Sequence, residues 1–340
     1  MMKKWILIVA AIVIVGTAGV GLWYYTALKS NCVVRDGEVY VHTGSTYADL
    51  VDQLTHGGNI KSMSRFQRAA RISNLDTEGV RPGRYVLKSP MGYRAAARMF
   101  RYGYQTPVRL TFNNIRLLPQ LAGRVSTQIE ADSVSLAAAL LADTTAARYG
   151  FDDRTFIAMF IPDTYEIYWT ATPDSFVAKM HKEWEKFWTE ERVAKLARTE
   201  LTKIEAVTLA SIVYEETKMR DEMPTVAGVY INRLRIGMPL QADPTVRFAA
   251  GDFTIKRVLD RHKEIDSPYN TYKIAGLPPG PICMPSVVAI DAVLDYRSHD
   301  YLYFCARPDF SGYHNFSTTL AQHNRNAAEY HHALNARGIK

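Results

Sequence analysis

The sequence is poor in cysteine: only Cys32, Cys283 and Cys305 occur among its 340 residues. Structural zinc sites take sets of cysteine and histidine ligands at short spacings, and these three positions offer none. The sequence therefore predicts no metal and no cofactor. In an oxidising compartment Cys283 and Cys305 could pair and leave Cys32 over, but the sequence alone does not decide this.

Runs of basic residues are also missing. The net charge is +7, but lysine and arginine are spread along the chain. No basic stripe or binding motif indicates nucleic acid as a partner, whereas the positive charge suits an anionic membrane surface or an anionic polymer. No period of about 20–50 residues repeats, which argues against a solenoid.

What the chain does have is a long apolar run at its N-terminus. No charge falls between Lys4 and Lys29, and the intervening 24 residues would form a helix about 36 Å long, enough to cross a bilayer. Trp5 at one end and Trp23 at the other suit the membrane interfaces, and Lys3 and Lys4 predict a cytoplasmic N-terminus. A cleaved signal peptide is the alternative, but the run is long for one and no A-x-A site follows it before Lys29. We expect a retained single-pass anchor with the rest of the chain on the far side.

Residues 31–106 are predicted to form a small mixed domain. A strand is expected at 38–44, helices at 45–58 and 61–73, a second strand within 81–89 and a further helix over 90–103. The helices predicted at 45–58 and 90–103 both end at a glycine, which is typical of a C-terminal cap. No acid, base or nucleophile clusters here, so this part of the chain is expected to bind or to space, and not to catalyse.

Residues 107–340 are predicted to form a larger domain, helix-rich to about residue 200 and then dominated by long loops. Phe176, Met180 and Trp184 recur at helical spacing, and we interpret them as a buried face. The loops MPLQADPTV, SPYNTYKIAGLPPGPICMPS and SGYHNFSTTLAQHN are rich in proline, glycine, polar and aromatic residues. Such loops on a rigid scaffold are a usual place for a binding site.

Two adjacent glutamates end the segment TKIEAVTLASIVYEETKM. Thr202 with Glu205 forms a predicted capping box at the start of this helix. At 100° per residue, Glu216 shares a sector with Leu209, Ile212 and Val213, whereas Glu215 falls with Thr208 and Ser211. Glu216 is therefore expected to be buried with a raised pKa, as a general acid requires, and Glu215 to be an ordinary surface charge. The alternative for Glu216 is a buried ion pair, for instance with Arg233.

Several segments, in this order, carry a family resemblance: LASIVYEET, VAGVYINRLRIGMPLQADPTV, SPYNTY, GLPPGPI, YLYF and HNFSTTLAQHN. They closely resemble the MltG (YceG-like) endolytic murein transglycosylases, and IPDTY (161–165) is similar to a further element of that family. The resemblance is strong from about residue 155 to 330 and weaker over 38–150, where the family carries a LysM-like domain. It implies an α+β fold with an N-terminal transmembrane helix (1–30), a small LysM-like domain (31–106) and a larger catalytic domain with cleft-forming loops (107–340).

The resemblance also implies a function. Family members lie in the bacterial inner membrane, face the cell wall and cut glycan strands between N-acetylmuramic acid and N-acetylglucosamine, leaving 1,6-anhydro ends. Their catalytic glutamate is the second of two in an Ile-Val-Glu-x-Glu segment, which falls on Glu216. The first is Tyr214 here, and this departure from the family pattern argues for a single catalytic carboxyl. The start of the catalytic domain also departs from the family, reading NNIRLLPQ (113–120).

The remaining candidates are predicted to bind substrate. Gln241 and Asp243 have groups for sugar hydroxyls, although Asp243 before Pro244 also fits a turn that caps the local backbone. The others are the aromatic and polar residues Tyr269, Asn270, Tyr272, Tyr165, His314 and Ser317.

Asp163 is predicted to cap the start of a helix. The spacing of His314 and His323, with Ser317 between them, favours neither a metal site nor a Ser-His triad.

The expected partners are peptidoglycan glycan strands, the inner membrane through the N-terminal helix, and peptidoglycan synthases. Two other functions remain open on the sequence. One is a non-catalytic glycan-binding scaffold of the cell-wall synthesis machinery; the other is a hydrolytic muramidase, which would leave free reducing ends.

Overall fold

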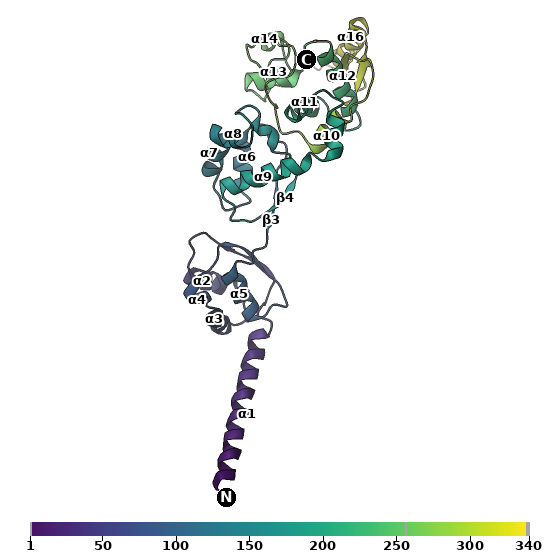
Figure 1. The fold of residues 1–340 in the computed structure, drawn as a ribbon. Coiled ribbons are helices and arrows are strands. Elements are labelled where there is room, and N and C mark those ends of the chain that lie inside the picture. Colours follow the sequence, from purple (N-terminus) through teal and green to yellow (C-terminus); the bar gives the residue numbers. More distant parts are fainter. Residues whose placement is uncertain (1, 256, 338–340) are drawn as a thin grey trace. The chain divides into compact units, whose positions relative to one another are not determined.

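The computed structural model describes residues 2–255 and 257–337. The chain divides into two compact units (Figure 1). Unit 1 comprises residues 1–110, 128–131 and 166–172, and unit 2 comprises 111–127, 132–165 and 173–340. Two of the boundaries between them fall within β3 (Val108–Thr111) and β4 (Thr164–Ile167).

Unit 1 contains helices around a two-stranded antiparallel sheet. Its elements are α1 (Met2–Lys29), β1 (Gly37–Val41), α2 (Tyr47–Gly57), α3 (Met63–Ile72), α4 (Leu75–Glu78), β2 (Gly83–Leu87) and α5 (Tyr93–Tyr102). β1 pairs with β2 in the register Gly37↔Leu87 to Val41↔Gly83. The predicted order strand–helix–helix–strand–helix is confirmed, with the short α4 as the addition.

Local sequence signals explain these boundaries. Thr46 caps α2 in a capping box with Asp49, and Gly58 ends it at φ 61°. Gly103 ends α5 at φ 70°, a left-handed conformation that glycine adopts without strain.

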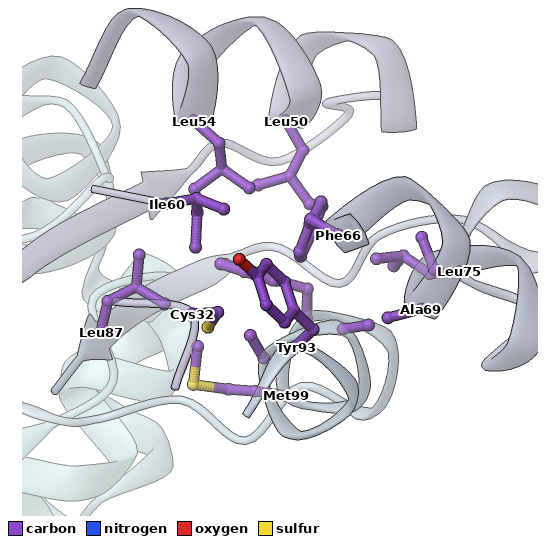
Figure 2. Close-up of a cluster of buried hydrophobic side chains, with 14 of the residues drawn as sticks. Cys32, Leu50, Leu54, Ile60, Phe66, Ala69, Leu75, Leu87, Tyr93 and Met99 are labelled. Atoms are coloured by element: carbon purple, nitrogen blue, oxygen red, sulfur yellow. The ribbon is translucent and has the colours of Figure 1, made fainter. Parts of the chain in front are cut away.

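The core of unit 1 gathers apolar side chains from every layer (Figure 2). Leu50 and Leu54 of α2 face Phe66 of α3 and Tyr93 of α5, all at most 1% exposed.

Helix α1 enters this core directly. Residues Ala10–Lys29 are long and apolar enough to cross a membrane. The last turn nevertheless belongs to unit 1, because Leu28 is only 5% exposed and lies in the same cluster. The backbone N–H of Cys32 donates to the carbonyl oxygen of Met91 at 2.7 Å, so no free linker separates α1 from the core.

Unit 2 is predominantly helical. Its elements are α6 (Leu118–Ser126), α7 (Ser133–Leu141), α8 (Asp143–Arg148), the 3-10 helix η1 (Phe156–Met159), α9 (Pro173–Phe187), α10 (Glu190–Leu196), α11 (Lys203–Glu216), α12 (Met223–Arg235), α13 (Asp243–Ala250), α14 (Asp260–Lys263), α15 (Val287–Leu294), β5 (Tyr303–Ala306), β6 (His314–Ser317) and α16 (Leu320–Ala336). β5 and β6 pair antiparallel as a hairpin. The chain is therefore mixed α+β and helix-rich, as expected. Phe176, Met180 and Trp184 of α9 are buried, which confirms their assignment to the core.

Helix α11 lies at the centre of unit 2 and packs against α12, α13 and α15. Every residue from Ala206 to Val213 is buried, so this part of the helix has no solvent-exposed face. Thr208 and Ser211 are accommodated because their hydroxyls donate to carbonyl oxygens of the same helix, those of Ile204 and Thr208. The predicted capping box of Thr202 and Glu205 is confirmed.

The expectation that Glu215 is an ordinary surface charge is wrong. Its side chain is only 13% exposed and pairs with Arg116, whose Nη2 lies 2.9 Å from Oε2. Hydroxyl groups on one side of a helix predict solvent exposure only where they require water as a hydrogen-bond partner. In α11 the carbonyl oxygens of the helix itself accept these hydrogen bonds.

Candidate active site

Glu216 is the last residue of α11 and lines a pocket of about 340 Å³. α12 contributes Tyr230, the segment leading into α13 contributes Gln241 and Asp243, and the loop after α14 contributes Tyr272. The β5–β6 hairpin and α16 complete the wall, with His314 from the hairpin. All of these elements belong to unit 2.

The carboxyl group of Glu216 is held by one defined hydrogen bond. Tyr230 donates its hydroxyl to Oε1 at 2.8 Å. Burial raises the pKa of the Tyr230 phenol well above its usual value, so this hydroxyl remains a donor.

Burial also raises the pKa of Glu216, to about 7. The nearby charge of Asp243 acts in the same direction, while the bond from Tyr230 and the charges of His314 and Arg247 oppose it. The predicted direction of the shift is therefore confirmed. The Arg233 guanidinium is used elsewhere, donating to the carbonyl oxygens of Leu302, Pro239 and Leu240.

Asp243 and Tyr272 form a second hydrogen-bonded pair in the pocket wall. The Tyr272 hydroxyl donates to Oδ1 of Asp243 at 2.7 Å. Asp243 is the first residue of α13, and Gln241 just before it has φ 51° while its N–H donates to the Thr271 carbonyl. This left-handed residue turns the chain into α13 beside Glu216.

His314, at the start of β6, reaches the pocket from the hairpin. Its Nδ1 lies 2.7 Å from Oε2 of Glu222, a carboxylate whose side chain is only 5% exposed.

Other predicted residues lie outside this pocket. Asn270 is fully buried, and its amide donates to the carbonyl oxygens of Lys263 and Ile265, which fixes the loop that carries Tyr272. Ser317 is also fully buried and accepts a hydrogen bond from Asn326. Tyr269 packs on Phe248, with ring centroids 4.6 Å apart.

Tyr165 and Asp163 line a separate pocket of about 190 Å³ beside α9. The Tyr165 hydroxyl donates to the Ile161 carbonyl oxygen. Asp163 accepts from the N–H of Thr164, the first residue of β4, so its prediction as a helix-start cap is wrong: a strand follows it.

Two residues next to Glu216 have no signal in the sequence pattern: Tyr230, which lies 14 positions after Glu216, and Glu222, which lies at the N-cap of α12. For Arg233 the sequence suggests only an ion pair with Glu216. A buried tyrosine or arginine in a helix is ordinary, and only the packing of α11 on α12 and the hairpin brings these side chains together.

The cysteines are all free among the residues described. Cys283 is buried beneath α11, and Cys305 lines the Glu216 pocket. Within 2–255 and 257–337, no group of three or more His, Cys, Asp and Glu side chains is arranged to hold a metal ion.

The model of the YceG-like family matches residues 39–329, most of the chain. The chain belongs to the YceG-like family. A crystal structure of a YceG-like protein from Listeria monocytogenes is similar with a TM-score of 0.55 and 26% identity, covering 86% of this chain and 99% of that one.

Two relatives of this YceG-like chain have the name endolytic murein transglycosylase. The one from Bacillus subtilis is 44% identical over 124 residues, which is 36% of this chain and 34% of that protein. The one from Streptococcus pneumoniae D39 is 32% identical over 190 residues, 55% of this chain and 33% of that protein. The chain thus matches these relatives over about a third of their length.

Proposed function

We propose that this YceG-like protein is an endolytic lytic transglycosylase that cuts peptidoglycan glycan strands between N-acetylmuramic acid and N-acetylglucosamine. The observation that carries the proposal is a single glutamate carboxyl in an open pocket, buried enough to raise its pKa to about 7 and held by Tyr230. The names of the relatives support the substrate class.

Glu216 would act twice in this reaction. As the acid, it gives its proton to the glycosidic oxygen while the bond from that oxygen to C1 of the muramic acid breaks. As the resulting carboxylate, it removes the proton of the C6 hydroxyl, whose oxygen attacks C1 and closes a 1,6-anhydro ring. The proton returns to Glu216 and no water is consumed, so one carboxyl suffices, whereas hydrolysis with inversion or by double displacement uses two.

The polar groups around Glu216 would position the sugar. Gln241, Asp243, Tyr272 and His314 share its pocket, and we propose these four as substrate contacts. Asn270 and Ser317 would act indirectly, through the loop and the hairpin that they hold.

The remaining parts of the chain fit the same role. We propose that α1 anchors the protein in the inner membrane with a cytoplasmic N-terminus, and that unit 1 is a LysM-like domain that binds or spaces the glycan. Peptidoglycan synthases remain the predicted protein partners.

The test compares Glu216→Gln with Glu215→Gln in the full chain in detergent, incubated with purified glycan strands. We expect anhydro ends from wild type and Glu215→Gln, and a loss of about 100-fold or more in Glu216→Gln, scored by mass spectrometry. Glu215 is the matched control because it is the neighbouring carboxylate on the same helix and lines a different, small pocket.

Other outcomes would overturn parts of the proposal. Equal activity in both variants would exclude Glu216 as the acid and base. Free reducing ends in place of anhydro ends would indicate a muramidase. Glycan binding by wild type without any cleavage would indicate a scaffold.

A further inference from the structure

Glu222 is a buried carboxylate that lies next to the pocket without lining it. It sits at the N-cap of α12 and is 6% exposed. Its two oxygens face three partners: Oε1 accepts from the backbone N–H of His314 at 2.8 Å, and Oε2 lies 2.7 Å from Nδ1 of His314 and 3.1 Å from the hydroxyl of Thr217.

These contacts determine which nitrogen of His314 carries a proton. Burial would raise the pKa of Glu222, but the hydrogen bonds from His314 and Thr217 outweigh it and hold the pKa below its usual range. An ionised carboxylate can only accept, so the Nδ1 of His314 must donate. In the neutral imidazole the lone pair is then on Nε2, the ring nitrogen left for a ligand in the pocket.

We propose that Glu222 is a positioning residue, which holds His314 with Nδ1 protonated so that Nε2 accepts a hydrogen bond from a sugar hydroxyl or acetamido N–H beside Glu216. This inference rests on the proposed function for the identity of the ligand. The orientation of the imidazole stands on the geometry alone.

Glu222 also links the two sides of the pocket. Thr217 directly follows Glu216 and caps α11, while His314 begins β6. One carboxylate therefore ties the end of the catalytic helix to the hairpin and sets the separation between Glu216 and His314.

A purely structural role, docking the hairpin, must be separated from this one. The neighbouring pair Asp221 and Tyr313 offers the matched control, because the Tyr313 hydroxyl donates to Asp221 at 3.2 Å between the same two segments. If docking alone mattered, removal of the Tyr313 hydroxyl would have an effect of the same kind as Glu222→Gln.

The kinetic test measures anhydro-end formation by the full chain in detergent. In Glu222→Gln an NH2 group must face one of the three donors, so we expect kcat/KM to fall by roughly 10- to 100-fold, with Tyr313→Phe unchanged. Because Glu222 acts through His314, adding Glu222→Gln to His314→Gln should cause little further loss. A full additional loss in the double variant, or an equal loss in Tyr313→Phe, would overturn the proposal.

The spectroscopic test needs neither activity nor a folded Glu222 variant. The full chain labelled with 15N-histidine is examined by NMR, and His314 is assigned by its absence in His314→Gln. We expect a protonated Nδ1 and an unprotonated Nε2; the opposite tautomer would overturn the proposal. If this tautomer is found in a protein that does not cleave glycan, the proposed function fails while the positioning role stands.

Discussion

A carboxyl group that is first an acid and then a base must be stable in both charge states within one site. The surroundings of Glu216 are balanced in this way. Burial and Asp243 favour the protonated form, while Tyr230 favours the carboxylate. A pKa of about 7 leaves both forms accessible at neutral pH.

This balance predicts a pH profile. In the proposed mechanism the free enzyme carries a protonated Glu216, so kcat/KM should fall as the pH rises through about 7. Tyr230→Phe removes a hydrogen bond to the carboxylate, so the pKa should rise and the falling limb should move to higher pH, by about 0.5 to 1 unit. The measurement is kcat/KM for anhydro-end formation against pH.

The control is Tyr296→Phe, because the Tyr296 hydroxyl accepts a hydrogen bond from Arg235 away from the pocket. Its profile should match wild type. A limb that moves to lower pH in Tyr230→Phe would contradict the assignment of Tyr230 as a donor to Glu216.

For single residues, the sequence predicted the direction in which a side chain points better than it predicted the hydrogen-bond partner of that side chain. Helical phase correctly indicated that the pKa of Glu216 is raised, although the residue is only partly buried. Asn270 and Ser317 were equally plausible as contacts, but their hydrogen-bonding groups hold backbone and a helix instead. The sequence does not show whether a polar loop residue binds a ligand or the protein's own backbone. The three-dimensional structure identifies the site, because it places Tyr230 of another helix against Glu216.

At the scale of elements, close packing of helices explains what the periodic pattern missed. α11 is buried on all sides between Ala206 and Val213, and α12 beside it carries Gly228 at a point of close approach. A Cβ on Gly228 would lie 2.4 Å from the carbonyl oxygen of Arg297 and 2.7 Å from Nε2 of His299. The backbone at Arg297 cannot move away from an added methyl group as easily as the end of a flexible side chain could.

Gly228→Ala should therefore destabilise unit 2 by about 1–3 kcal/mol despite the better helix propensity of alanine. Gly123→Ala in α6 is the matched control, because no atom lies within 4 Å of its Cβ position. There alanine should stabilise by about 0.5–1 kcal/mol. Denaturant unfolding followed by circular dichroism would measure both, and destabilisation of equal size in the two variants would contradict the packing argument.

Local signals predicted elements far better than their environment. The capping residues Thr202, Gly58 and Gly103 marked helix ends that the structure confirms. The burial of Ser211 and Glu215 is not predicted by the sequence, because it depends on the Ile282 N–H that donates to Ser211 and on Arg116 that pairs with Glu215. Both partners come from distant parts of the chain.

At the scale of the whole molecule, the family model runs across both units, from residue 39 to 329. The N-terminal helix is an integral part of unit 1, and this can be tested. Leu28→Ala should destabilise unit 1 by about 2–5 kcal/mol, because Leu28 is 5% exposed in the core.

Leu22→Ala provides the comparison on the same helix, because Leu22 is 65% exposed. It should leave the thermal unfolding of unit 1 in detergent unchanged. An unchanged midpoint for Leu28→Ala would show that the last turn of α1 does not contribute to the core.

The direct entry of α1 into the core of unit 1 has a mechanical consequence. If α1 spans a membrane, as proposed, it is rigidly connected to unit 1, because no flexible linker lies between Leu28 and Cys32. When the helix spins about its long axis, unit 1 must turn with it, and when the helix tilts, unit 1 must lean by the same angle. A bilayer around α1 would thereby limit the orientations that unit 1 can adopt relative to the membrane.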